Sequence, residues 1–389
     1  MRIASAICAG DQPAVLAADL AHQLQSQLQG APVDLVVAFV TIQLAPAFPE
    51  VLATLQKQLA ARSILACTAE SVLGVDREIE RSAAVSALAM SLPGITVKPF
   101  HLAEDEWADI LGDNQVLRTR LELPTDLRLF VVLGDPFTTP VVQLLDACSE
   151  EFPAAPVVGG MASGITQPGQ TRLTMNGNIY SSGLVGVGMA GPLQVDCVVS
   201  QGCRPVGHTM VITRAHQNVI EQLDGTPAIA AIGRMLEDLP RKDREMIEKV
   251  GLQIGRAIDE RKGNFGRGDF LIRNILSLDR QQGHLTIGDM IHEKQTVQFQ
   301  VQDSHSAAED LRLLLQGELL LANAPTGALM FTCNGRGTHL FGTPHHDIST
   351  VRSVLGSVPV AGFFCAGELG PVGGRNFIHG QTVSLALFR

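Results

Sequence analysis

Short apolar runs alternate with amphipathic stretches along this 389-residue chain. Residues 35–41 and 63–68 are apolar runs bounded by polar or turn-forming residues, a pattern that predicts buried strands. Between them, residues 49–61 carry apolar positions at helical spacing, and residues 13–29 show the same spacing up to a stop at Gly30. Strands that alternate with helices in this way predict an α/β fold.

The same order of elements, strand, helix, strand and strand, occurs three times. The first copy ends with a strand at residues 84–92, and each copy has a cluster of small residues where its second strand ends. The second copy comprises residues 129–135, 141–148, 156–160 and 183–189, and the third comprises residues 327–333, 348–355, 358–364 and 382–388. Agreement in order, spacing and loop type predicts diverged internal repeats, which form mixed β-sheets covered by helices.

A region of different pattern separates the second and third copies. It predicts strands at residues 195–199, 208–213, 218–223, 270–278 and 296–302, with a turn at residues 279–283 joining the last two. It predicts helices at residues 227–239, 241–261 and 303–318. At this length two domains are expected, and we place them at residues 1–210 and 211–389.

Composition removes several classes of function. A net charge of −10 and the absence of a Lys/Arg-rich block argue against nucleic acid as a partner. The N-terminus has no long apolar region, and the most apolar stretch, residues 35–48, is too short to span a bilayer, so no membrane insertion is expected. Seven cysteines without a C-x-x-C pair favour reduced thiols in the cytoplasm and disfavour zinc. No metal or cofactor is expected.

Candidate chemistry lies on two glycine-rich loops that follow predicted strands. One loop carries Glu368, Arg375, Asn376 and His379, and the other, at residues 333–337, reads CNGRG. Glycine after a strand allows positive φ and close backbone approach. If the two strands are neighbours, Asn334 and Arg336 lie beside Glu368 and Arg375 in one cleft, at the edge where open α/β sheets bind ligands.

Several of these stretches together resemble one family. They read CTAESVLGVDREIE, VVGGMASG, VVSQGCRPVG, FLIRNILSLD, CNGRGTHLFG and FFCAGELGPVGGRNFIHG. The chain resembles the FIST family (F-box and intracellular signal transduction) over nearly its whole length, with an N-terminal and a C-terminal FIST domain. The resemblance implies a sensory module that binds a small ligand, with amino acids proposed as ligands. Multidomain members carry their own signalling domains, so this stand-alone pair implies a separate signalling protein as partner.

A zwitterionic amino acid needs one cation and one anion in its site. Arg336 or Arg375 suits the ligand carboxylate, Glu368 suits the ammonium group, and Asn334 and Asn376 offer directional hydrogen bonds. Six further candidates are weaker, because helix capping, loop capping or internal ion pairing explains them equally well. The weaker candidates are Thr68, Glu70 and Ser163 in the repeat-equivalent loops, together with Cys203, Arg204 and Arg273. For Arg273, Glu368 is a candidate partner.

Three functions are compatible with these residues. The favoured one is a cytoplasmic sensor that binds a small polar metabolite. The second is a cysteine-dependent hydrolase or transferase, with Cys365 or Cys333 as nucleophile and a nearby histidine as base. Buried cysteines usually only pack, which weakens this enzyme hypothesis. The third is a scaffold that binds another protein.

Overall fold

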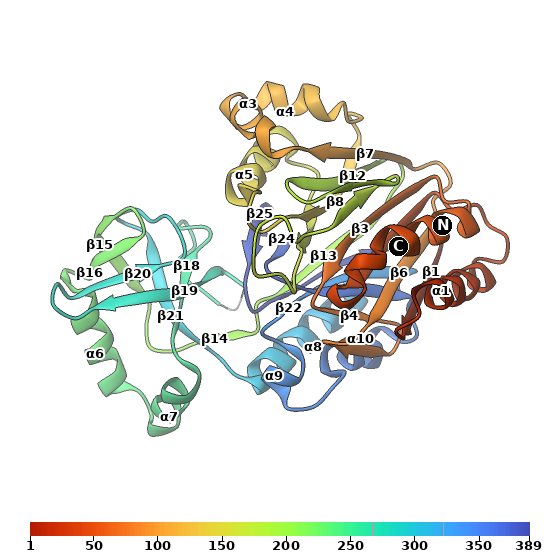
Figure 1. Ribbon diagram of the computed structural model, residues 1–389. Coiled ribbons are helices and arrows are strands. Elements are labelled where there is room, and N and C mark those ends of the chain that lie inside the picture. Colours follow the sequence, from red (N-terminus) through yellow and green to blue (C-terminus); the bar gives the residue numbers. More distant parts are fainter. Residues whose placement is uncertain (267, 322) are drawn as a thin grey trace. The chain divides into compact units, whose positions relative to one another are not determined.

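A computed structural model describes residues 1–266, 268–321 and 323–389 (Figure 1). The chain divides into two compact units, and each is described by itself. Unit 1 contains residues 1–200 and 311–389, and unit 2 contains residues 201–310. The predicted domains, residues 1–210 and 211–389, are continuous along the chain, whereas unit 1 combines two separate segments. The compact units therefore do not test the predicted boundary at residue 210. The boundary therefore stays a prediction.

Unit 1 is built from the three repeats predicted from the sequence. The first contains β1 (Arg2–Ala9), α1 (Pro13–Leu28), β2 (Leu35–Thr41), a 3₁₀ turn (Ile42–Ala47), α2 (Phe48–Leu59), β3 (Ser63–Ala69), β4 (Ser71–Gly74), β5 (Arg77–Glu80) and β6 (Ala84–Ser91). The second contains β7 (Thr96–Leu102), a 3₁₀ turn (Glu104–Glu106), α3 (Trp107–Gly112), α4 (Asn114–Leu121), β8 (Leu127–Gly134), α5 (Val141–Glu151), β9 (Val157–Met161), β10 (Leu173–Met175), β11 (Asn178–Tyr180) and β12 (Leu184–Ala190).

The third repeat is split by unit 2. It begins with β13 (Val195–Ser200) and resumes after unit 2 with the end of α8 (Ser304–Leu321). It continues with β22 (Gly327–Cys333), α9 (Gly337–Phe341), α10 (His346–Leu355), β23 (Val360–Cys365), β24 (Glu368–Val372), β25 (Arg375–His379) and β26 (Val383–Phe388). Unit 2 thus lies in the chain between β13 and most of α8, and α8 stands before β22 as α1 stands before β2.

Each repeat forms a six-stranded sheet, and all three sheets have the same strand order. The orders are β1-β6-β2-β3-β10-β11, β7-β12-β8-β9-β24-β25 and β13-β26-β22-β23-β4-β5. In each sheet the two central strands are parallel, as in β2–β3, β8–β9 and β22–β23. The sheets are therefore mixed, as the sequence predicts.

The last two strands of each sheet come from another repeat. The hairpin β4–β5 of the first repeat joins the third sheet, β24–β25 of the third repeat joins the second sheet, and β10–β11 of the second repeat joins the first sheet. The exchange is cyclic, because every repeat gives one hairpin and receives one. An isolated hairpin of two short strands is marginally stable in water, so each exchanged hairpin depends on the sheet that receives it.

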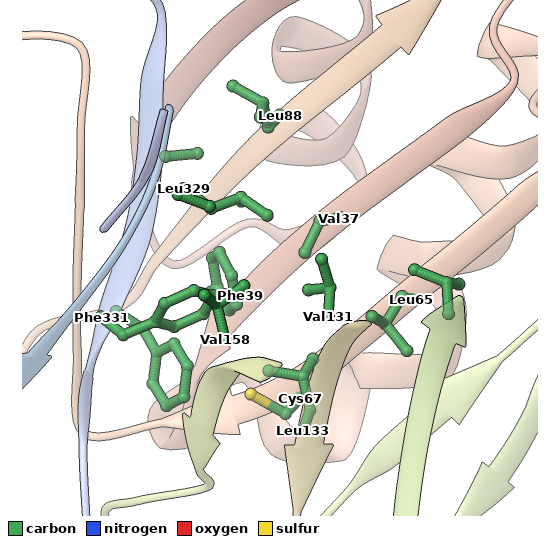
Figure 2. Close-up of a cluster of buried hydrophobic side chains, with 14 of the residues drawn as sticks. Val37, Phe39, Leu65, Cys67, Leu88, Val131, Leu133, Val158, Leu329 and Phe331 are labelled. Carbon is green, nitrogen blue, oxygen red and sulfur yellow. The ribbon is translucent and has the colours of Figure 1, made fainter. Parts of the chain in front are cut away.

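The inner faces of the three sheets share one core. The rings of Phe39, Phe331 and Phe363, from two sheets, lie with centroids 4.8–6.1 Å apart. Figure 2 shows Phe39 and Phe331 in one cluster of buried side chains with Val131 and Val158 of the second sheet. Helices cover the outer faces: α1 and α2 on the first sheet, α3 to α5 on the second, and α8 with α10 on the third (Figure 1). This arrangement directs the parallel strand ends of all three repeats to one region.

Unit 2 is an eight-stranded sheet with two helices. It contains β14 (Cys203–Pro205), β15 (Met210–His216), β16 (Val219–Leu223), β17 (Thr226–Pro227), α6 (Ala228–Asp238), α7 (Arg241–Val250), β18 (Gln253–Ala257), β19 (Phe270–Asp279), β20 (His284–Ile287) and β21 (Thr296–Gln302). Its own apolar core includes Ile212, Leu285 and Phe299.

Three sequence-based expectations about elements are wrong. The helix expected over residues 241–261 ends at Val250, because Gly251 takes a positive φ of 80° and strand β18 follows. The turn at residues 279–283 leads into β20, not directly into the strand at 296–302. The glycine-rich segment after Cys365 is a hairpin, β24–β25, with Gly373 and Gly374 at its turn. Glu368 and His379 are therefore paired strand residues and not loop residues.

Candidate functional site

Parallel strands β22 and β23 bring two of the predicted segments together. Cys333 stands opposite Cys365 in the register, and the Asn334 backbone N–H donates to the Cys365 carbonyl at 3.1 Å. Glu368 begins the next strand, and the Thr382 N–H donates to its Oε2 at 3.2 Å. Cys333, Asn334, Arg336 and Glu368 thus form one polar cluster, which we call the third-repeat site.

The Glu368 carboxyl is fully buried and incompletely bonded. The weakly donating Cys333 thiol lies within reach of it, but in the described part of the chain no group hydrogen-bonds Oε1 with good geometry. Burial raises the pKa of Glu368 well above its usual range, and the Thr382 N–H and the Arg336 charge only partly oppose this. Burial therefore favours the protonated form of this carboxyl, and a cation beside it would favour the carboxylate.

Cys333 and Asn334 form the wall of the site nearest the surface. Both residues are half-buried, and the Gly335 N–H donates to the Cys333 sulfur at 3.4 Å. The Asn334 Oδ1 is buried and finds no partner among the residues that the structure describes. Among the described residues, neither Glu368 Oε1 nor Asn334 Oδ1 accepts a well-formed hydrogen bond, which is unusual for buried acceptor atoms.

The cysteines are poorly suited to nucleophilic chemistry. Burial and the neighbouring Glu368 raise the pKa of Cys333 to about 12, and burial raises the pKa of Cys365 well above its ordinary value. A reactive cysteine needs a lowered pKa, because the thiolate is the nucleophile. This electrostatic environment disfavours the cysteine-enzyme hypothesis.

Arg336 is buried and already paired. Its Nε and Nη2 contact the two oxygens of Asp347 at 2.7 and 2.9 Å, and both side chains are essentially inaccessible to water. The guanidinium also lies 5.3 Å from the centroid of the Phe341 ring. Arg336 holds the pKa of Asp347 far below its usual range despite burial. The remaining nitrogen, Nη1, donates only a long bond of 3.4 Å to the Gln381 carbonyl.

The hairpin received from the first repeat completes this region. Glu78 of β5 is buried, and its Oε1 accepts from the Ile348 N–H at the start of α10, at 3.0 Å. Glu80 accepts from the N–H and the hydroxyl of Thr338 at the start of α9. Sequence reasoning assigned neither Asp347 nor Glu78 to the site. Asp347 was interpreted as part of the start of a helix, because it follows two histidines and a proline. Glu78 was missed because it lies far from the other site residues in the sequence.

Arg375 and Asn376 lie away from the third-repeat site and contact α5. Arg375 forms an exposed ion pair with Asp146 at 3.2 Å. The Asn376 Oδ1 accepts from the Val157 N–H at 2.8 Å, and its backbone N–H donates to the Ser149 hydroxyl at 3.1 Å. Both contacts hold β25 against its host repeat.

Ser163, Thr68 and Glu70 lie where the strand ends of different repeats meet. The Ser163 hydroxyl donates to the Phe364 carbonyl and accepts from the Glu70 N–H at 2.8 Å. The Thr68 hydroxyl accepts from the Arg172 N–H at 3.1 Å, and the Glu70 carboxylate pairs with Arg81 at 2.9 Å. Their polar groups are thus engaged within the protein, as the capping alternative expects.

Arg204 and Arg273 belong to unit 2, as does Cys203. Arg204 pairs with Asp243 at 2.6 Å, and the Cys203 thiol donates to the Gln253 side-chain oxygen at 2.9 Å. Arg273 pairs with Asp289 at 3.2 Å. Asp289 is thus a partner of Arg273 within unit 2, where the sequence analysis offered Glu368 as a candidate.

The other two repeats provide an internal comparison for the third-repeat site. At the end of β2, the Thr41 hydroxyl donates to the Ala84 carbonyl and accepts from its N–H. After β8, Asp135 accepts from the hydroxyls of Thr138 and Thr171. These groups are satisfied within the protein, whereas Asn334 and Glu368 in the third repeat each have an oxygen that accepts no well-formed hydrogen bond from the residues that the structure describes.

Two negative findings apply to the described residues. No group of three or more His, Cys, Asp or Glu side chains in them could hold a metal ion. No helix in them is long and apolar enough to cross a membrane.

Comparisons with known proteins identify the family. The FIST N domain model matches residues 34–226, and the FIST C domain model matches residues 228–371. An uncharacterized protein of Mycobacterium tuberculosis (strain ATCC 25618 / H37Rv) is 36% identical over 391 residues, covering 100% of both chains. An uncharacterized protein of Mycobacterium bovis is 35% identical over 390 residues, covering 100% of this chain and 99% of its own.

The solved structures that are similar include a cyanuric acid hydrolase, described as an evolutionary innovation by structural concatenation. It covers 100% of both chains at 11% identity, with a TM-score of 0.28, which does not establish a common fold.

FIST domains are sensory domains associated with signal transduction. Because both family models match in a single chain, in order and over most of its length, this protein belongs to the FIST family.

Proposed function

We propose that this protein is a cytoplasmic sensor that binds a small polar metabolite at the third-repeat site and signals to a separate protein. The observation that carries the proposal is the pair of buried acceptor atoms, Glu368 Oε1 and Asn334 Oδ1, beside the parallel strand ends. Leaving a buried polar atom unbonded costs about 1–3 kcal/mol. A ligand that donates hydrogen bonds to both oxygens recovers that cost.

The charges around the site favour a ligand with an amino group. The carboxyls of Glu368, Asp347 and Glu78 outnumber the single guanidinium of Arg336. An ammonium group supplies both the missing N–H donors and a positive charge that stabilises Glu368 as a carboxylate. An amino acid fits this description.

Arg336 can meet the carboxylate of an amino acid only through Nη1. Its other two nitrogens are held by Asp347, and Nη1 has the long contact with the Gln381 carbonyl. The ligand carboxylate would replace that weak bond with a charge-assisted one. Asn334, Arg336 and Glu368 are therefore the proposed ligand-binding residues, and Arg375 and Asn376 are left as supports of β25.

The proposal is tested by thermal shift and titration calorimetry across a panel of amino acids and simple amines. A ligand at 100 times its Kd stabilises the folded state by about 2.7 kcal/mol. In Glu368→Gln, the amide cannot neutralise the ammonium group, and we expect binding to weaken by about 1.5–3 kcal/mol. Arg375→Ala, in the same hairpin but outside the site, is the matched control and keeps its affinity.

Two results would count against the sensor. One is a flat thermal-shift panel for the wild-type chain. The other is a ligand whose affinity is the same in Glu368→Gln and in the wild type, because that ligand binds elsewhere.

A further inference from the structure

We propose that one face of α8 in unit 1 binds the same face of a second copy of this chain, with the two helices antiparallel. Four leucines form this face, and we call it the leucine face. Its members are Leu313, Leu314, Leu320 and Leu321. The proposal concerns assembly of the protein and does not depend on the ligand proposed for the third-repeat site.

The leucine face turns away from the side of α8 that packs on the third sheet. Leu311 and Leu315 are fully buried on that side, within the core of the third sheet. Leu320 and Leu321 are 88% and 84% exposed, more than any other large apolar side chain in the described part of the chain. The other two members of the face are 40% and 45% exposed. A contiguous apolar group with this exposure marks an interaction surface.

Gly317 lies at the centre of the leucine face. Leucines stand three and four positions before it and three and four positions after it, and residues at these spacings share one side of a helix. Glycine inside a helix costs about 1 kcal/mol relative to alanine. Among the described residues, no contact within the chain requires a glycine here, because nothing lies within 4 Å of its Cβ position. A small residue, glycine or alanine, lets the backbone of a second helix approach closely.

The leucine face is complementary to itself when the two helices are antiparallel. A two-fold axis beside Gly317 then exchanges the positions before the glycine with those after it. Leu313 of one copy meets Leu320 of the other copy. Leu314 meets Leu321 in the same way, so apolar pairs form on both sides of the two glycines. This symmetry of the pattern about its centre favours a second copy over an unrelated partner.

The charges of α8 favour a protein partner over a membrane surface. The helix contains one arginine and three acidic residues, and the whole chain has a net charge of −10. A helix that lies on an anionic membrane has Lys and Arg along its polar face. Arg312 donates to Gln316 at 3.0 Å, and Glu318 pairs with Arg389 at 3.1 Å. The charged groups beside the leucine face are thus bonded within the chain, and the face itself is uncharged.

The test is sedimentation equilibrium of the full chain over a wide range of concentration. We expect a reversible dimer for the wild type. Leu320→Glu puts a carboxylate opposite Leu313 of the other copy, so the Kd of the dimer should rise at least tenfold, and Leu313→Lys should have a similar effect. The double variant with both changes should regain the dimer, because antiparallel helices bring each new lysine to the new glutamate of the other copy.

Val15→Glu is the matched control, because Val15 is 53% exposed on α1, which covers a different sheet. It should dimerise as the wild type does. Melting curves should show that all variants fold, since the substituted side chains are exposed. Should Leu320→Glu fail to fold, the equivalent pair Leu314→Lys and Leu321→Glu takes its place.

Three results would overturn the proposal. The first is a wild type that stays monomeric, and its sedimentation with vesicles of anionic phospholipid would then assign the leucine face to a membrane surface. The second is a Leu320→Glu variant that dimerises as tightly as the wild type. The third is a double variant as monomeric as the single variants, because it excludes the antiparallel arrangement.

Discussion

The ion pair between Arg336 and Asp347 fixes the loop after β22 against the start of α10. Because both side chains are inaccessible to water, removing one partner leaves an uncompensated buried charge. We expect Asp347→Ala to lower the free energy of unfolding by about 3–5 kcal/mol, measured by urea denaturation.

The paired substitution Arg336→Met with Asp347→Leu distinguishes a structural role from a charge requirement. It removes both charges and keeps apolar volume, so it should recover most of the stability lost in the single variant. A double variant as unstable as Asp347→Ala would show that the charges themselves are needed for the fold.

Glu78 makes the stability of unit 1 depend on pH near neutrality. Burial, with the neighbouring Asp347, raises the pKa of Glu78 from 4.5 to about 7. The folded state therefore holds a proton that the unfolded state has already lost between pH 4.5 and 7. Stability is greatest at the acidic end of this window and falls as the pH rises through it, by roughly 3 kcal/mol for this group.

Glu78→Gln should flatten that pH dependence and raise the melting temperature at pH 8. The amide oxygen can still accept from the Ile348 N–H, so the capping contact at α10 is kept. Melting curves from pH 5 to 8 provide the measurement. Glu80→Gln is the control, because Glu80 is half-buried and accepts from Thr338 at the start of α9; it should keep the wild-type dependence of melting temperature on pH. The same pH dependence in the wild type and in Glu78→Gln would contradict the assignment of this dependence to Glu78.

At the scale of elements, two glycines differ in the space around them: Gly362 in β23 is tightly packed, and Gly317 in α8 is open. A Cβ at Gly362 would stand 1.7 Å from the Met330 carbonyl oxygen of the parallel neighbour β22. We expect Gly362→Ala to cost at least about 3 kcal/mol, because backbone on both sides must shift. Gly317, inside α8, has nothing within 4 Å of its Cβ position. Gly317→Ala should therefore stabilise the protein by about 0.5–1 kcal/mol, and equal effects at the two sites would contradict this account.

The sequence predicted the two parallel strands of each repeat and the strand that closes it, because their apolar runs are continuous and flanked by turn residues, but it did not predict β1. It did not predict β4 and β5, whose four residues each are too short to show a period. Edge strands such as β7, reading TVKPFHL, also mix polar and apolar residues without a clear alternation. Which sheet receives each hairpin depends on packing between remote segments, and local pattern does not contain that information.

The third-repeat site could be predicted in part. Glycines after β22 and β23 marked Asn334, Arg336 and Glu368, and the parallel pairing of these strands brings them together. The burial of Arg336 and its pairing with Asp347 were not visible, because they depend on how α10 returns over the sheet. Glu78 joins the region only through the hairpin exchange, so no sequence spacing could have indicated it.

At the scale of the whole molecule, we expect unit 1 to unfold as one cooperative body, because every sheet contains a hairpin from another repeat. Each received hairpin carries a fully buried leucine: Leu73, Leu173 and Leu369. Changing any one of them to alanine should cost about 2–5 kcal/mol and lower the same calorimetric transition by a similar amount. Leu285→Ala, in the separate core of unit 2, should leave that transition in place. Three different transitions for the three hairpin variants would show that the repeats unfold independently.

The exchange of hairpins also sets an order for folding during synthesis. The hairpin β4–β5 leaves the ribosome early, but the strand that receives it, β23, is among the last to appear. At ~5–20 residues per second, the interval is on the order of tens of seconds. Throughout that time the hairpin β4–β5 lacks its sheet, and until β10–β11 is made the edge of the first sheet at β3 is also unfilled; both are open to wrong partners. A nascent chain stopped before residue 360 should therefore remain protease-sensitive within residues 71–80, and the completed chain should protect them.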